Sequence, residues 1–277
     1  MEQNKYTVAS VLSIAGFDGS GGAGIQADTK TISALGCYAM NVLTALPVQN
    51  TQGVKKIYDI PTQAIKDQLE TIFEDIYPSA VKIGMVHHAA LVELIADFLK
   101  DYTGHIIFDP VMVSTSGHKL IEDDTIHACI ERLFPLATLI TPNLDEVAVL
   151  INEQIDSLPK MQEAGSKLLQ LGAQAVLVKG GHLPGTDLSS ILLSDKGSQL
   201  FSTDRIDTLN THGSGCTLSS AIASYMARGE AFSTAVGHAL DYVNKAIQGS
   251  QHLLIGRGNG PLNHFHNPQK LITYDMD

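Results

Sequence analysis

Short apolar runs rich in valine and isoleucine alternate with longer segments of helical periodicity along most of this chain. The strand candidates span residues 8–15, 42–48, 80–84, 105–109, 138–141 and 175–179. The helix candidates between them span residues 23–35, 62–76, 89–100, 123–133 and 161–171. Strands that are apolar on both faces are typical of parallel sheets covered by helices. The alternation therefore predicts an α/β fold with a mainly parallel central sheet.

The pattern changes after residue 179. Residues 188–194 and 199–203 flank Asp195-Lys196-Gly197, and this arrangement predicts a small β-hairpin. The helices expected after the hairpin span residues 214–228 and 231–248. From about residue 256 the chain is rich in Gly, His and Pro, and we expect an irregular tail. Because no repeat, linker or shift in composition divides the sequence, we expect a single domain over residues 1–277.

Composition and charge exclude several classes of partner. Apolar residues make up 44% of the 277 residues and charged residues 17%, which is typical of a compact enzyme with a large core. The formal net charge of −11 argues against nucleic acid or an anionic membrane as a partner. No run approaches the roughly 20 apolar residues of a membrane span. Three widely spaced cysteines and an opening without a secretory pattern predict a cytoplasmic protein.

The segment from Gly19 to Gly24 has the pattern G-x-G-x-x-G of a dinucleotide-binding turn. An NAD-dependent oxidoreductase would also need an acidic residue about 20 residues further on, at the end of the second strand. No acidic residue occurs between Asp28 and Asp59, so that hypothesis lacks its ribose ligand. A P-loop is excluded because no G-K-[ST] follows. A tight strand-to-helix turn without a ligand stays open.

Two further glycine clusters indicate a phosphate site. Thr211-His212-Gly213-Ser214-Gly215-Cys216-Thr217 precedes a helix of small residues. The first N–H groups of such a helix are uncrowded, and with the helix dipole they form an anion site. Lys179-Gly180-Gly181 lies at a strand end, where parallel sheets place their ligands.

Carboxylates are expected at the same edge of the sheet. Asp109 ends one strand, while Asn143 and Glu146 open a helix after another. These groups can hold the waters of a Mg²⁺ ion that bridges phosphates. The alternative is a helix cap, with Asn143 at the N-cap and Glu146 at N3, and both roles can coexist.

The histidines do not predict a metal site. His87 and His88 are adjacent and cannot face one ion from a regular element, and His264 and His266 have no third ligand nearby in the sequence. We interpret the last two as packing in the tail.

Taken together, the motifs resemble one known family. They read, in order, IAGFDGSGGAGIQADTKT, LTALPVQNTQGV, VKIGMV, DPVMVSTSG, LITPNLDEVAVL, VLVKGGH, THGSGCTLSSAIA and GPLNHFH. From residue 11 to about 266, the chain resembles the hydroxymethylpyrimidine/phosphomethylpyrimidine kinases of thiamine biosynthesis, in the ribokinase superfamily. The resemblance implies a three-layer α/β/α ribokinase-like fold, ATP as phosphoryl donor, Mg²⁺, and a homodimer.

The resemblance also implies that the first glycine loop contacts the pyrimidine and not a nucleotide. The implied pocket residues are Gly16, Ala23, Asp28, Gln49, Met85, Val111 and Cys216. Asp28 and Gln49 would pair with the amino group and ring nitrogens, while Met85 and Val111 would cover the ring faces. Core packing is the alternative for Met85.

The implied reaction is in-line attack of the 5-hydroxymethyl oxygen on the γ-phosphorus of ATP, followed by phosphorylation of the monophosphate product. The N–H groups implied to stabilise the moving phosphoryl belong to Gly213, Ser214, Gly215 and Cys216. Lys179 would add positive charge, and Asp109, Asn143 and Glu146 would position Mg²⁺. The implied nucleotide contacts are Lys179, Gly181, Thr211, His212, Ser214 and, near adenine, His238.

Cys216 stands where most ribokinase relatives carry a catalytic aspartate, whereas the branches that handle aminopyrimidines or pyridoxal carry cysteine. A helix N-terminus lowers the pKa of a thiol, which favours a thiolate base. The alternative is a small buried residue that contributes only its N–H.

Other functions stay open on these residues. Pyridoxal kinase is the nearest alternative, but Gln49-Asn50-Thr51 and residues 260–266 match the pyrimidine kinases better. An oxidoreductase or a non-catalytic binding protein would leave Lys179 and Cys216 without roles. A loop over Ser114–Leu120 that closes over the substrate is a further expectation.

Overall fold

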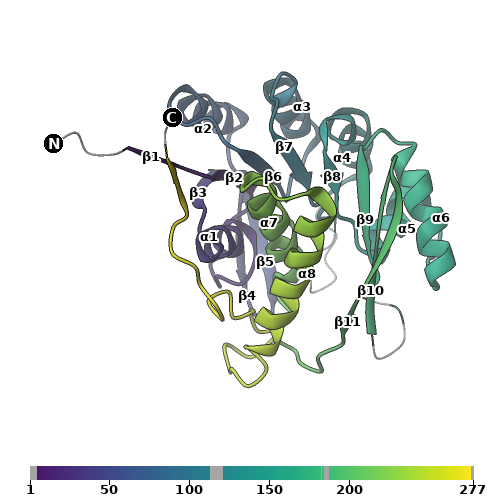
Figure 1. The fold of residues 1–277 in the computed structure, drawn as a ribbon. Coiled ribbons are helices and arrows are strands. Elements are labelled where there is room, and N and C mark those ends of the chain that lie inside the picture. The colour runs from purple at the N-terminus through teal and green to yellow at the C-terminus, as the bar shows by residue number, and fades with distance from the viewer. Residues whose placement is uncertain (1–4, 113–120, 182, 184–186, 276–277) are drawn as a thin grey trace.

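The computed structural model describes residues 5–112, 121–181, 183 and 187–275, and an eight-stranded sheet forms their centre (Figure 1). Its order is β11-β10-β9-β8-β7-β6-β2-β3. The strands are β2 (Ser10–Ala15), β3 (Tyr38–Leu43), β6 (Ala80–Ile83), β7 (His105–Phe108), β8 (Leu139–Ile140), β9 (Ala175–Lys179), β10 (Asp187–Ser194) and β11 (Gly197–Asp204). Neighbours from β3 to β9 are parallel, while β10 and β11 are antiparallel additions at one edge. The predicted hairpin is confirmed, with Ser194 opposite Gly197.

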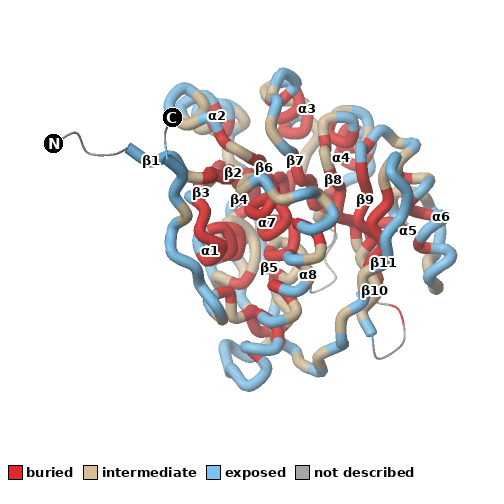
Figure 2. Tube along the Cα trace, viewed as in Figure 1, coloured by how far each residue is buried: buried red, intermediate tan, exposed pale blue. Residues whose placement is uncertain are grey.

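Helices cover both faces of the sheet, as the apolar strands predicted. On one face lie α1 (Gly24–Ala34), α7 (Ser214–Ala227) and α8 (Phe232–Gln248). On the other lie α2 (Thr62–Asp75), α3 (Ala89–Leu99), α4 (Asp123–Ala128), α5 (Leu144–Ile151) and α6 (Leu158–Leu169). Alternate residues of a strand point into the two cores. Leu12 and Ile14 pack against the helices α2 to α6, and Val11 packs against α1, α7 and α8. Figure 2 shows this burial through the centre of the molecule.

The helix expected over residues 123–133 changes its geometry after one and a half turns. α4 ends at Ala128, a π-helical turn spans Cys129–Leu133, and a 3₁₀ turn spans Phe134–Leu136. Pro135 lacks an N–H donor and contributes to the end of the regular helix. No helix among the residues that the structure describes is long and apolar enough to cross a membrane.

The strand predicted over residues 42–48 is wrong, because the chain leaves the sheet within it. β3 ends at Leu43, and β4 (Ala45–Asn50) pairs antiparallel with β5 (Gly53–Asp59) as a separate arm. Pro47 supplies no ladder donor and is disfavoured in a central strand, so the sequence carried a signal for this break. β5 was not predicted, because Lys55 and Lys56 interrupt its apolar pattern.

The tail is only partly irregular. Residues 256–272 contain no helix or strand, but β12 (Thr273–Asp275) pairs antiparallel with β1 (Tyr6–Val8). The predicted strand over residues 8–15 is therefore divided into β1 and β2. Before β12 the tail returns to the main sheet's helices, where the N–H of Asn263 donates to the carbonyl of Ala246.

The two cores make a stability prediction. Leu12 on central β2 is fully buried, whereas Leu254, which follows α8, is 92% exposed. We expect Leu12→Ala to lower the free energy of unfolding by about 2–5 kcal/mol, because it opens a cavity in the core. Leu254→Ala, the matched control, should change it by less than about 0.5 kcal/mol. Urea titrations measure both, and equal losses would contradict this arrangement of the core.

Candidate active site

A cavity of about 680 Å³ opens at the carboxyl ends of the parallel strands, between the starts of α1 and α7. Most of the predicted site residues line this cavity. They are Gly16, Ala23, Gln49, Met85, Val111, Asn143, Gly181, Thr211, His212, Gly213, Ser214, Gly215 and Cys216. The structure thus brings the first glycine loop, the end of β9 and the start of α7 to one space.

Asp18, which the sequence analysis did not single out, organises the first glycine loop. Its buried carboxylate accepts hydrogen bonds from the N–H groups of Gly22 (3.1 Å) and Ala23 (2.7 Å) and from the Ser20 hydroxyl (2.7 Å). Nε2 of His212 lies 2.9 Å from the same carboxylate. Burial alone would raise the pKa of Asp18, but these hydrogen bonds lower it to about 2. The sequence did carry an indication of this role, because Asp18 lies two residues before Ser20 in a turn. In this pattern the aspartate side chain commonly binds the local backbone.

The glycines allow two backbone segments to touch. Gly213 has φ 84°, and a Cβ there would overlap the carbonyl oxygen of Gly22. A Cβ on Gly22 would overlap the ring of His212. The first glycine loop therefore packs against the turn before α7, and this close approach by itself requires glycine at both positions.

The start of α7 offers the predicted N–H donors, with one exception. Gly213 is the N-cap and provides no side-chain cap. The N–H of Ser214 is occupied, since it donates to the carbonyl of Thr211 at 3.2 Å. Within the described part of the chain, no acceptor engages the N–H groups of Gly213, Gly215 and Cys216. These donors at the positive end of the helix dipole suit an anion.

An ion pair lies directly beneath this helix start. Nζ of Lys179 is 3.0 Å from Oδ1 of Asp109, which also accepts from the Thr141 hydroxyl at 2.9 Å. Burial raises the pKa of Asp109, but Lys179 and Lys82 outweigh it and hold the pKa below its usual range. A Cβ on Gly215 would lie 3.4 Å from both the Asp109 carboxylate and the Lys179 ammonium. Because Gly215 has no side chain, nothing at this position separates the Lys179–Asp109 pair from a group held at the helix start.

Asn143 and Glu146 form the predicted capping box of α5. Oδ1 of Asn143 accepts from the N–H of Glu146 at 2.9 Å, and the Glu146 carboxylate accepts from the N–H of Asn143 at 2.7 Å. Burial raises the pKa of Glu146 to about 7, against the attraction of Lys179. Capping is confirmed, while the Mg²⁺ role stays a prediction.

The residues of the site fit a Mg²⁺ ion that takes only part of its ligands from the protein. No group of three or more His, Cys, Asp or Glu residues suited to a metal occurs in the described ranges. Mg²⁺ usually keeps several waters and takes one or two carboxylates together with phosphate oxygens. Asp109 and Glu146 can supply those carboxylates, so the residues fit an ion completed by water and by a phosphate ligand.

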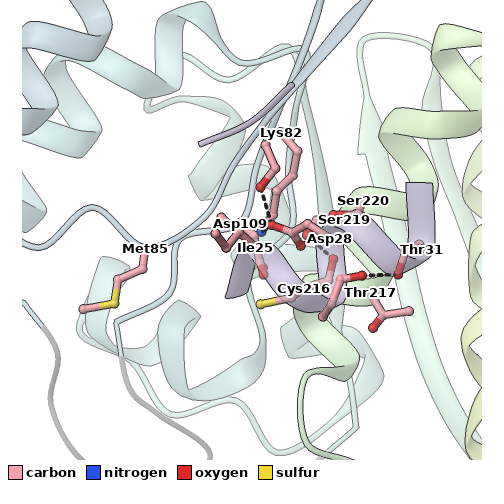
Figure 3. Close-up of polar contacts among 12 residues, drawn as sticks. Ile25, Asp28, Thr31, Lys82, Met85, Asp109, Cys216, Thr217, Ser219 and Ser220 are labelled. Atoms are coloured by element: carbon pink, nitrogen blue, oxygen red, sulfur yellow. Dashed lines mark hydrogen bonds and ion pairs between the residues drawn. The ribbon is translucent and has the colours of Figure 1, made fainter. Parts of the chain in front are cut away.

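Asp28 does not reach the cavity, contrary to prediction. It is fully buried, and its carboxylate accepts from the hydroxyls of Ser13 and Ser220 and from Nζ of Lys82, which lies 2.8 Å away (Figure 3). Both oxygens are thus engaged inside the protein. Helical periodicity could not show that Asp28 faces the sheet, where Lys82 on β6 is also fully buried.

His238 lies at the wrong end of the site for the predicted contact with adenine. Its side chain is 56% exposed, pairs with Glu230 at 2.8 Å and packs against Tyr225. Tyr225 follows Ser214 by eleven residues, which is about 16 Å along α7. Two other residues of α8, Asn244 and Ile247, line the cavity instead.

A further wall of the cavity was not predicted. It comprises Leu188, Arg205, Ile206, Asp207 and Thr208, together with Asn244 and Ile247. The segment after β11 adjoins α8 in this wall, since the Asn244 amide donates to the carbonyl of Asp204, the last residue of β11, at 2.9 Å. Arg205 is fixed in this wall, because its guanidinium donates to the carbonyl of Leu183 at 2.7 Å. The residues of this segment belong to none of the motifs that predicted the site.

The predicted lowering of the Cys216 pKa is wrong for the ligand-free protein. Burial raises the pKa of this thiol to about 11, although the nearby Lys82 ammonium opposes the rise. The helix N-terminus was expected to dominate, but the carboxylates of Asp28 and Asp109 also disfavour the thiolate. Cys216 nevertheless lines the cavity next to the free N–H groups.

The remaining histidines have structural partners. Nδ1 of His88 accepts from the N–H of Leu91 and caps α3, and His87 pairs with Asp59 at 2.7 Å. His264 is buried in the tail, 3.1 Å from the Thr217 hydroxyl, as tail packing predicted. The loop Ser114–Leu120 lies outside the described residues.

Comparison with known proteins agrees with this geometry. Residues 18–263 match the family described as phosphomethylpyrimidine kinase. A hydroxymethylpyrimidine/phosphomethylpyrimidine kinase of Rhizobium meliloti is 44% identical over 259 residues, which cover 93% of this chain and 97% of the relative.

Two solved structures share the expected ribokinase-like α/β fold. The phosphomethylpyrimidine kinase of Clostridium difficile superimposes with a TM-score of 0.77 at 43% identity, covering 86% of this chain and 99% of its own. The pyridoxal kinase of Bacillus subtilis, solved as an ADP complex, has a TM-score of 0.86 at 34% identity, covering 93% and 98%. By sequence and by structure, the chain belongs to the phosphomethylpyrimidine kinase family.

Proposed function

We propose that this protein is an ATP-dependent kinase that phosphorylates 4-amino-5-hydroxymethyl-2-methylpyrimidine and then its monophosphate, in thiamine biosynthesis. The observation that carries the proposal is the contact between the first glycine loop and the turn before α7 around one cavity. An alcohol held at the first loop would face the free N–H groups of Gly215 and Cys216. The names of the relatives at 43–44% identity support the same substrate.

The pyrimidine would lie against the first glycine loop. Gln49 on the β4–β5 arm offers an amide to its polar edge, and Met85 and Val111 offer apolar surface to its ring. Asp28 is left out of this set, because its carboxylate is occupied. Gly16 and Ala23 leave room for the ring beside the backbone.

The nucleotide would extend from the start of α7 along the other half of the cavity. Gly181, Thr211 and His212 lie near the phosphate end. Residues 205–208 and Asn244 form the remaining wall, and we assign them to the nucleoside in place of His238. The solved pyridoxal kinases that carry ADP or AMP-PCP support a nucleotide in this fold.

In the first transfer, a bond forms between the alcohol oxygen and the γ-phosphorus, and the bond from that phosphorus to the leaving ADP oxygen breaks. The N–H groups of Gly215 and Cys216 stabilise the charge on the moving group, and Lys179 adds its positive charge. Mg²⁺, when bound, neutralises phosphate charge, and Asp109 and Glu146 would hold it through water. The hydroxyl proton passes to the sulfur of Cys216 in its thiolate form, which becomes the thiol.

We also propose a cytoplasmic homodimer. The resemblance to the family supports the dimer, and the spacing of the three cysteines supports a reducing compartment.

Pyridoxal phosphorylation is a second candidate, supported by the high TM-scores of pyridoxal kinases. We expect kcat/KM for the aminopyrimidine alcohol to exceed that for pyridoxal, because identity is higher to the pyrimidine kinases. A coupled ADP-release assay with each alcohol measures this. A preference for pyridoxal would overturn the assignment of substrate.

The two transfers should respond differently to loss of the thiol. We expect Cys216→Ala to slow the first transfer by about 10²–10⁴-fold, the usual contribution of a general base. The second transfer should lose far less, because its phosphate nucleophile is already an anion. Cys37→Ala, at a buried cysteine outside the cavity, is the control. Single-turnover assays measure the rate of each transfer in each variant. An equal loss of rate in both transfers would exclude Cys216 as the base.

The rate of the first transfer should also depend on pH. With a thiol pKa of about 11, the thiolate fraction rises about tenfold per pH unit through the neutral range. We expect the single-turnover rate of the first step to rise from pH 7 toward pH 10, while the second step stays nearly flat. Parallel profiles for both steps would contradict proton transfer to Cys216.

The loop anchor gives a further test. We expect Asp18→Asn to lower kcat/KM by roughly 10²-fold, since small displacements of the loop misalign the alcohol. An amide can accept fewer of the hydrogen bonds that now converge on Asp18. Asp195→Asn in the hairpin turn is the matched control and should behave like the parent. Unchanged kinetics for Asp18→Asn would show that the loop needs no anchor.

A further inference from the structure

A buried ion pair lies behind the candidate active site, and the reaction described above gives it no role. Lys82 on β6 and Asp28 on α1 are both fully buried, with Nζ and Oδ2 2.8 Å apart. Ser13 on β2 and Ser220 on α7 donate to the same carboxylate. One carboxylate thus joins β2 and β6 to α1 and α7, the two helices that begin at the cavity. Figure 3 shows Asp28 beside Lys82 and Ser220.

Stability alone is a weak reason for such a pair. Removing two charges from water costs several kcal/mol per ion, and apolar residues of similar volume are often as stable. The pair therefore calls for another explanation, and its position in the fold suggests one.

The ammonium of Lys82 points to the active-site end of the sheet. A Cβ on Gly84, two residues further along the chain, would lie 2.7 Å from Nζ. Ser220 follows Cys216 by one helical turn, so both face the same side of α7. The pair is therefore anchored one turn behind the thiol that faces the cavity.

Among the residues that the structure describes, four charged groups act on Cys216 from the elements packed around it. Lys82 on β6 and Lys179 at the end of β9 are positive, while Asp28 on α1 and Asp109 after β7 are negative. Lys179 is already paired directly with Asp109. If Lys82 were neutral, the uncompensated carboxylate of Asp28 would face the sulfur and oppose a thiolate.

We propose that Lys82, held in place by Asp28, is a positioning residue that keeps a fixed positive charge behind Cys216 and favours its thiolate. This role rests on the proposed first transfer, in which the sulfur takes the hydroxyl proton. Asp28 has two effects: it orients the ammonium, and its own charge partly offsets that of Lys82.

The test uses the full-length, ligand-free protein. The probe is iodoacetamide, which alkylates the thiolate and releases iodide, and mass spectrometry follows the peptide that contains Cys216. We expect Lys82→Met to slow alkylation at pH 9 by about tenfold, which corresponds to one pKa unit upward. Asp28→Asn should accelerate it, because the lysine charge is then uncompensated. Lys82→Arg retains the charge and should stay close to the parent.

The opposite signs separate electrostatics from damage to the fold. A loosened structure would expose Cys216 in both variants and accelerate both reactions. Cys129, which is 2% exposed and remote from the pair in the other core, reports such opening in the same digest. Changes of the same sign, or an unchanged rate in Lys82→Met, overturn the proposal. If Lys82→Met does not fold, Asp28→Asn decides alone, and a failure to accelerate overturns it.

Kinetics distinguish this proposal from the proposed function. We expect Lys82→Met to lower the rate of the first transfer about tenfold with KM for the pyrimidine unchanged, and to spare the second transfer. If the parent does not phosphorylate the pyrimidine, the proposed function fails, while the alkylation result still stands. If the parent phosphorylates the pyrimidine but Lys82→Met leaves the alkylation rate unchanged, only the proposed role of Lys82 is overturned.

Discussion

The rest of the site depends on the contact between two glycine-containing segments that are almost 200 residues apart in the chain. Asp18 binds the backbone of its own loop and, through His212, the turn before α7. Gly22 and Gly213 have no side chains, and the two backbones can therefore meet. This contact sets the separation between the wall that would hold an alcohol and the helix start that would hold a phosphoryl group. A dinucleotide-binding turn has no such requirement.

The electrostatics of the site explain how an acidic protein can handle phosphate. The chain carries a net charge of −11, and both lysines near the start of α7 are paired with aspartates. The attraction for an anion therefore comes mainly from oriented N–H groups and the helix dipole. Such groups are already in place before the reaction and do not reorganise as charge moves from donor to acceptor. A loose transition state for phosphoryl transfer benefits from this kind of stabilisation.

Structural likeness and sequence identity point to different neighbours. The B. subtilis pyridoxal kinase has the higher TM-score, while the C. difficile phosphomethylpyrimidine kinase has the higher identity. A shared fold does not determine the substrate, because specificity depends on the few side chains around the ring. The side chains that we propose for this role in this chain are Gln49, Met85 and Val111, which line the cavity. Gln49 lies on the β4–β5 arm, and Met85 and Val111 lie just after the ends of β6 and β7.

Local patterns in the sequence were enough for much of the fold. Apolar runs identified the parallel strands, and Asn143 and Glu146 identified their capping box, because each depends on neighbours within a few residues. The glycine motifs also predicted that the end of β9 and the start of α7 meet, since strand ends meet at one edge of a parallel sheet. The pocket residues Gly16, Gln49, Met85 and Val111 came from the resemblance to the family. Pro47 indicated that β4 does not continue the central sheet. Two lysines interrupt the apolar pattern of its partner β5, so the sequence did not predict that strand.

The direction and charge state of buried side chains were decided only in three dimensions. Asp28 was expected in the pocket, yet it faces Lys82, which is 54 residues away in the chain. His238 lies on the expected helix but at the wrong end of the site, because the crossing of α7 and α8 places Asn244 at the cavity. The pKa of Cys216 is raised by burial and by Asp28 and Asp109, against Lys82, and these three charges lie on other elements. The sequence thus determined which segments form strands, helices and glycine turns, whereas long-range packing determined which polar groups meet, because desolvation and pairing act between residues far apart in the chain.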